Sequence, residues 1–126
     1  MAAVTPSEVR GARSGKTILT YYGAGAANTD ATLTTTAVPK HKTQRVLWAS
    51  AVYSGSVTQT GVTFTIDSGL GSGYDTLLTT GTGNAQTSVY LPDGDIMLQP
   101  GDALAITALA GGAGDVASIQ VVLEQN

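Results

Sequence analysis

The clearest secondary-structure signal in the chain is the stretch Gly61-Val-Thr-Phe-Thr-Ile-Asp67. Apolar residues take every second position, so Val62, Phe64 and Ile66 would share one face and the polar residues between them the other. This period of two is typical of a β-strand with one buried face. Residues 116–124 repeat the pattern, so the sequence predicts that strands recur towards the C-terminus.

Short β-like runs with turn signals between them extend over most of the chain. We expect strands at residues 16–22, 31–38, 43–54, 61–67, 74–80, 86–91, 96–98, 103–109 and 116–124. Pro92-Asp-Gly-Asp95 and Gln99-Pro-Gly-Asp102 are typical of tight turns, because Pro presets φ and Gly accepts positive φ. The pattern predicts an all-β fold, an antiparallel β-sandwich with a jelly roll of about eight strands as the preferred topology. An immunoglobulin-like sandwich is the alternative.

The composition favours strands and turns over helices. Thr occurs 19 times and Gly 16 times, while charged residues make up 12% of the chain. Thr suits a pleated surface and Gly suits tight turns. The absence of Cys excludes disulfides, thiolate nucleophiles and zinc-thiolate sites. No signal peptide or membrane-spanning run is evident, so we expect a soluble protein that is made in the cytoplasm.

The charge is distributed unevenly along the chain. Residues 1–45 hold six bases and two acids, Glu8 and Asp30, whereas residues 46–126 hold seven acids and no base. We expect a flexible N-terminal arm at residues 1–14, which orders on a partner, followed by one sandwich domain at residues 15–126. The predicted partner-binding residues are the six bases, Arg10, Arg13, Lys16, Lys40, Lys42 and Arg45.

Two patterns resemble catalytic or nucleotide-binding motifs but lack essential features. The stretch Gly11–Thr17 is similar to a phosphate-binding loop, but Arg10 stands where that motif needs its first Gly, and a strand follows instead of a helix. His41, the single His, lies in a basic loop without a nucleophile elbow. One His also cannot supply the several ligands of a cupin metal centre. We therefore expect no catalytic residues, no metal and no cofactor.

Other binding chemistries are weaker alternatives. Asp67, Asp75, Asp93 and Asp95 sit in or beside Gly-rich turns and could bind calcium, although Asp is preferred in turns anyway. The net negative charge of the chain disfavours nucleic-acid binding. Aromatic side chains could form a sugar-binding platform, although single aromatics on strands more often pack in a core; they are Tyr21, Tyr22, Tyr53, Tyr74, Tyr90 and Trp48.

The stretch from Arg45 to Glu124 resembles small virion proteins of tailed bacteriophages. The resemblance covers about two-thirds of the chain and rests on Arg45-Val-Leu-Trp48, Asp67-Ser-Gly-Leu-Gly71, Tyr74-Asp-Thr-Leu77, Leu91-Pro-Asp-Gly-Asp95, Leu98-Gln-Pro-Gly-Asp102 and Ala110-Gly-Gly-Ala-Gly114. It implies a non-enzymatic structural protein, a capsid decoration (cement) protein that binds the major capsid protein on the virion surface. It also implies a homo-oligomer, a dimer or trimer, with no nucleic-acid or membrane partner. A head or tail fibre module that binds host glycans is the alternative.

The inward positions of the expected strands form a candidate hydrophobic core. We expect it to contain Leu19, Val46, Trp48, Val62, Phe64, Ile66, Val89, Leu104, Ile106, Ile119, Val121 and Leu123.

Overall fold

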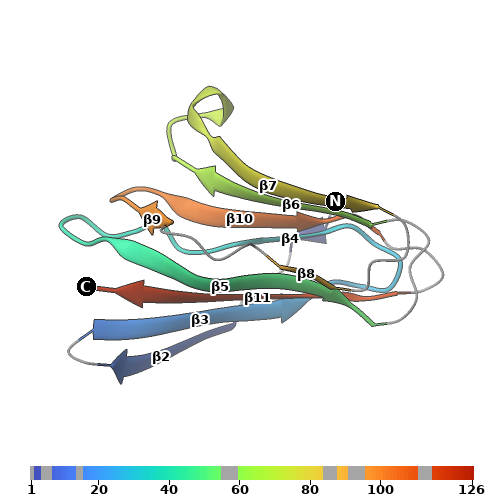
Figure 1. Ribbon diagram of the computed structural model, residues 1–126, viewed down its shortest axis with the longest axis horizontal. Coiled ribbons are helices and arrows are strands. Elements are labelled where there is room, and N and C mark those ends of the chain that lie inside the picture. Colours follow the sequence, from blue (N-terminus) through green and yellow to red (C-terminus); the bar gives the residue numbers. More distant parts are fainter. Residues whose placement is uncertain are drawn as a thin grey trace.

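The alternating stretch around Phe64 forms β6 (Thr60–Asp67), a strand inside a five-stranded sheet (Figure 1). The computed structural model describes residues 2–3, 7–13, 16–54, 60–83, 88–90, 96–110 and 115–126. Within them the chain forms strands and one short 3-10 turn, η1 (Ser72–Tyr74), and contains no α-helix. The all-β prediction is therefore confirmed.

The five-stranded sheet has the order β1-β4-β10-β6-β7. Its strands are β1 (Ala2–Ala3), β4 (Ala31–Thr34), β10 (Ala103–Ala108), β6 and β7 (Thr76–Gly83). The short β1–β4 pair is parallel and the other pairs are antiparallel. Phe64 lies opposite Ile106 in the register, so the apolar faces of β6 and β10 coincide.

The second sheet is six-stranded, with the order β2-β3-β11-β5-β8 and β9 paired to β5. Its strands are β2 (Ser7–Arg13), β3 (Lys16–Ala24), β11 (Ala117–Gln125), β5 (Gln44–Tyr53), β8 (Ser88–Tyr90) and β9 (Met97–Leu98). All these pairs are antiparallel. The chain crosses repeatedly between the sheets, because β3 and β5 belong to this one and β4 and β6 to the other.

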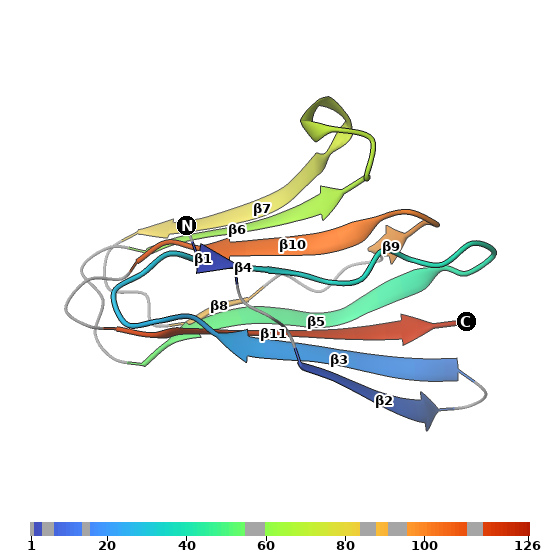
Figure 2. The same ribbon diagram turned by 180° about the vertical axis from the view of Figure 1, so that it is seen from behind.

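The two sheets bury one shared hydrophobic core, which confirms the predicted β-sandwich. Its largest fully buried side chains are Phe64, Leu19, Leu33, Leu98, Leu104, Ile106, Ile119, Leu123, Gln44, Val62 and Val121. The jelly-roll topology stays a prediction at this point. Figures 1 and 2 show β7 and β2 at opposite extremes of the molecule, one at the outer edge of each sheet.

Most of the predicted core is confirmed, and Trp48 is the error. Nine of the twelve residues are buried: Leu19, Val46, Val62, Phe64, Leu104, Ile106, Ile119, Val121 and Leu123. Ile66 packs partly buried against the core, and the side chain of Val89 lies outside the described residues. Trp48 is 44% exposed. The register of β5 explains this, since Val46 pairs with Leu123 and Trp48 with Val122, which leaves Leu47 as the extra residue of a β-bulge.

Two segments of the predicted N-terminal arm form strands, since Ala2–Ala3 make up β1 and a longer segment follows. Ser7–Arg13 form β2, which pairs with β3 along its whole length. Pairing into a sheet is one way in which a terminal segment becomes ordered. Residues 1, 4–6 and 14 of the predicted arm lie outside the described part of the chain.

Candidate functional site

The residues considered for catalysis or nucleotide binding lie in a turn and at the ends of two strands. His41 is exposed in the turn between β4 and β5, where its φ of 65° lies in the left-handed region. The stretch Gly11–Thr17 spans the end of β2 and the start of β3. Among the described residues, no group of three or more His, Cys, Asp or Glu side chains is placed to hold a metal ion. In the same part of the chain, no helix is long and apolar enough to cross a bilayer.

Two of the carboxylates considered for calcium binding, Asp67 and Asp75, accept backbone hydrogen bonds within turns, and so does Asp102. The Gly69 amide donates to Asp67 (2.9 Å), and the Ser68 amide donates to Asp75 (3.0 Å). The Gln99 amide donates to Asp102 (2.9 Å), next to Gly101 at a φ of 91°. These contacts are the turn chemistry for which Asp is preferred. Asp93 and Asp95 lie outside the described residues.

Five of the six predicted partner-binding bases gather at one end of the six-stranded sheet. Lys40 and Lys42 lie in the turn before β5, Arg45 is on β5, and Lys16 opens β3 opposite Arg13, the last residue of β2. We call this group the basic end. Figure 1 shows why it forms: the start of β3, the start of β5 and the C-terminus all lie at the left.

The basic end borders acidic residues on the other sheet. Lys16 forms an exposed ion pair of 3.4 Å with Glu124, whose register partner on β5 is Arg45. Asp102 approaches from the five-stranded sheet, because its carbonyl accepts a hydrogen bond from the Val38 amide just before the turn. Asp67 pairs with the neighbouring Ala103. Apart from Glu124 on β11, this end of the sandwich is therefore basic on the six-stranded sheet and acidic on the five-stranded sheet.

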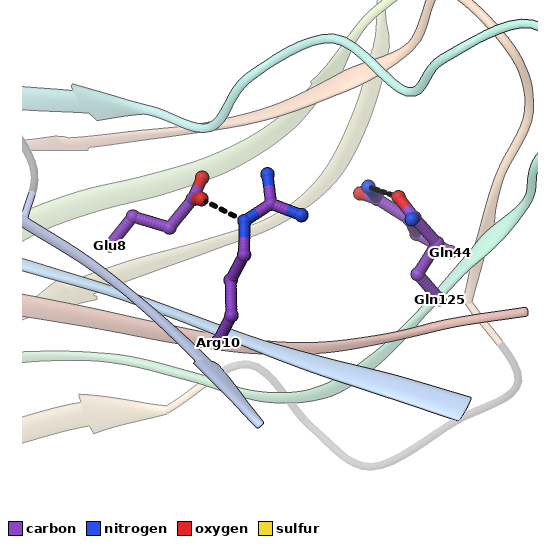
Figure 3. A network of polar contacts seen from close by, with 4 residues as sticks. All are labelled: Glu8, Arg10, Gln44 and Gln125. Carbon is purple, nitrogen blue, oxygen red and sulfur yellow. Dashed lines mark hydrogen bonds and ion pairs between the residues drawn. The ribbon is translucent and has the colours of Figure 1, made fainter. Parts of the chain in front are cut away.

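Arg10, the sixth predicted base, lies apart from the basic end. Its register partner on β3 is Leu19, so it is on the core-facing side of the edge strand β2. Its Nε donates to Glu8 at 2.7 Å. Figure 3 shows this pair on the same side of the sheet as Gln44 and Gln125, whose side-chain amides share a hydrogen bond of 2.9 Å. Arg10 therefore belongs to a polar fringe of the core.

Tyr21 lies beside this fringe, on β3. Burial is the main cause that raises the pKa of its phenol. A hydrogen bond with Thr36 opposes the shift, while the Glu8 carboxylate adds to it. Glu8 and Tyr21 are register partners, so the Glu8 side chain lies beside the nearly fully buried Tyr21.

A second surface, which the sequence analysis did not identify, covers the side of the six-stranded sheet that faces away from the core. We call it the outer face. Among the residues whose burial the structure describes, its exposed large apolar side chains come from four strands and are Val9, Tyr22, Trp48, Val52 and Met97. The register aligns Val9, Thr20, Val122 and Trp48 in one row across β2, β3, β11 and β5. The alternation along β3 could have identified Tyr22 as an outer-face residue. Neighbouring residues of a strand face opposite sides of the sheet, so a buried Tyr21 places Tyr22 on the outside.

A groove of about 550 Å³ crosses the outer face beside Tyr22. Small residues, Ala24 and Ser118, form its floor in one cross-strand row with Val52. Its polar lining includes Ser50 and Gln120, and none of the described residues that line it is charged. The Trp48 indole donates a hydrogen bond of 3.2 Å to the Ser50 hydroxyl next to the groove. The groove therefore offers aromatic, hydroxyl and amide groups without charge.

A smaller hollow of about 250 Å³ lies where the outer face meets the basic end. It is lined by Lys16, Thr43, Arg45, Met97, Glu124 and Asn126. The basic end and the outer face are thus continuous on one sheet. No protein-family model matches the chain, and no curated protein is significantly similar to it.

Proposed function

We propose that the chain is a non-enzymatic structural protein of a bacteriophage virion, a decoration protein that binds the capsid through its basic end. The observation that carries the proposal is the gathering of Lys16, Lys40, Lys42 and Arg45 at one end of the six-stranded sheet. Their exposure and common position suit electrostatic docking on an acidic surface. The resemblance of residues 45–124 to small virion proteins supplies the capsid as the partner.

We also propose that the sandwich is a jelly roll. What supports this is the strand order, in which β3-β11-β5-β8 and β4-β10-β6-β7 form two sets of four, one in each sheet. Eight antiparallel strands in two such sheets suit the jelly rolls that are frequent in viral capsid domains.

Cosedimentation with assembled capsids tests the decoration proposal. The variant Lys40→Gln with Lys42→Gln should lower the bound fraction and flatten its dependence on salt, because the docking is electrostatic. The matched control is Ala26→Glu with Ala27→Glu, which changes the net charge equally at exposed positions after β3, at the opposite end of the sheet. Equal binding by both variants and the wild type would exclude the basic end as the docking surface.

The groove on the outer face supports a second candidate function, a fibre or adsorption module that binds neutral glycans. Tyr22 offers an aromatic surface for a sugar ring, and Ser50 and Gln120 offer uncharged hydrogen-bonding groups. A glycan array discriminates the two functions. Binding that Tyr22→Ser abolishes and the Lys40/Lys42 variant retains would favour the adsorption module.

A further inference from the structure

The outer face carries several large apolar side chains that stay exposed in the described part of the chain. Val9, Trp48 and Val52 are between 41% and 53% exposed, although the strands that carry them lie within the sheet. Contiguous apolar patches of this kind are rare on monomeric soluble proteins unless they mark an interaction site. We propose that the outer face is the interface of a two-fold homodimer, in which the six-stranded sheets of two copies pack face to face.

The dimensions of the outer face suit such a dimer. Four long strands, β2, β3, β11 and β5, lie side by side, which gives a width of about 20 Å at the usual strand spacing. The nine residues of β3 extend about 30 Å. The face therefore covers about 600 Å² per copy, or about 1,200 Å² for two, which reaches the size of specific protein interfaces.

The charge distribution favours a second copy over an acidic or phosphate-bearing partner. A two-fold axis places a surface against itself, so a face of one sign would repel its copy. The central rows of the outer face carry Tyr22, Gln120 and Ser50, and then Val9, Thr20, Val122 and Trp48, none of them charged. The charged residues Lys16, Arg45 and Glu124 stay at its border.

The outer face is also self-complementary in shape, because it combines protruding side chains with a groove that can receive them. It carries protruding aromatic side chains, Tyr22 and Trp48, and a groove of about 550 Å³ that has room for an aromatic ring. Aromatic side chains that enter pockets commonly dominate interface energies. The hydrogen bond from Trp48 to Ser50 helps to hold the indole in place before association, which reduces the entropy lost on binding.

The dimer inference does not rest on capsid binding. An axis that runs along the strands would leave the basic ends of both copies on the same side of the dimer. Each copy could then present Lys40 and Lys42 to the same surface. The two proposals are therefore compatible, but either can fail alone.

The single Trp of the chain makes the interface directly measurable, because Trp48 lies within it. We expect sedimentation velocity to show a monomer–dimer equilibrium. With rising protein concentration, Trp48 emission should shift to the blue and acrylamide quenching should fall. Tyr22→Ser should raise the dimer dissociation constant at least about tenfold. Leu77→Ser, at an exposed apolar position on the other sheet, is the matched control and should leave it unchanged.

Three outcomes would overturn the dimer. One is a monomer at every concentration with constant Trp48 emission. Another is a dimer that Tyr22→Ser and Val52→Ser leave unchanged. The third is a monomer whose Trp48 emission changes on adding neutral oligosaccharides, which would assign the outer face to a glycan. The wild-type measurement needs no variant, and the capsid assay with the Lys40 and Lys42 variant reports separately on the proposed function.

Discussion

Val46 and Trp48 point to opposite faces of the six-stranded sheet, although they lie two residues apart on β5. Regular strands place residues i and i+2 on the same face. Here the register skips Leu47, because Val46 pairs with Leu123 and Trp48 with Val122. The β-bulge directs Val46 into the core and turns Trp48 to the surface.

Substitution of these two residues should therefore have unequal effects on stability. Val46→Ala should lower the free energy of unfolding by about 2 kcal/mol, because it leaves a cavity in a packed core. Trp48→Ser should cost less than about 1 kcal/mol in the monomer, since its side chain is largely outside the core. Urea denaturation, followed by circular dichroism at a low protein concentration, measures both. A larger loss for Trp48→Ser than for Val46→Ala would contradict the bulge.

The Tyr53 hydroxyl links the two sheets and should make stability sensitive to alkaline pH. It donates a hydrogen bond of 2.7 Å to the Leu109 carbonyl just after β10. Tyr53→Phe should cost about 1 to 2 kcal/mol at neutral pH, because the carbonyl loses its donor. Thermal unfolding measures the loss, and Tyr74→Phe, at an exposed position, is the control that should leave stability unchanged.

The pH dependence follows from the pKa of the same phenol, which burial raises above its ordinary value of 10.0. The unfolded chain then loses its proton first as the pH increases. The stabilising contribution is complete below pH 10.0 and is lost as the pH rises through the higher pKa of the folded state. The free energy of unfolding should be measured below and above pH 10.0. It should fall at the alkaline end in the wild type, and it should fall less steeply in Tyr53→Phe. A decline of equal slope in both proteins would exclude Tyr53 as a cause.

Thr35 continues the β4–β10 pairing with its side chain. Its amide donates to the Leu104 carbonyl (3.0 Å), and its buried hydroxyl accepts from the Leu104 amide (2.9 Å). Thr35→Val keeps the shape but removes the acceptor, so it should destabilise the protein by about 1 to 3 kcal/mol. Thr35→Ser retains the hydroxyl and serves as the control. Hydrogen exchange at the Leu104 amide should accelerate in the Val variant alone, and equal exchange in both variants would count against the bond.

The sequence was sufficient to predict the positions of the main strands because their signal is local. Alternation around Phe64 and Ile119 identified the buried faces of β6 and β11, and turn residues such as Gly101 separated the strands. The β2 strand was missed because its sequence, Ser7–Arg13, lacks an apolar alternation. Backbone pairing with β3 is what places it in the sheet.

The surfaces could be predicted only in part, since they depend on register and topology. The charge asymmetry identified the bases, but antiparallel pairing brings Lys16 and Arg45 to one end through β11, the strand between them. The outer face depends on the β-bulge at Leu47, and no residue type in this stretch predicts a bulge. Arg10 was grouped with the other bases because sequence position does not reveal on which side of β2 it lies.

Two glycines test the packing between the β3–β4 connection and the core. A Cβ on Gly25 would lie 2.8 Å from the Cβ of Ala31, which is fully buried on β4. A Cβ on Gly11, on the edge strand β2, would meet nothing within 4 Å. Gly25→Ala should therefore destabilise the protein by about 1 to 3 kcal/mol through overpacking. Gly11→Ala should be neutral or stabilise it by about 0.5 kcal/mol, because it restricts the unfolded chain.

A double-mutant cycle shows whether the contact with Ala31 causes the loss at Gly25. Ala31→Gly removes the methyl group that the new Cβ would strike, so the double variant should be more stable than the two single losses predict by addition. Urea denaturation of the four proteins gives the interaction energy directly. Strict additivity would mean that the strain at Gly25 arises from the backbone of the β3–β4 connection, whose amide at Gly25 donates to the Ala117 carbonyl at 2.9 Å.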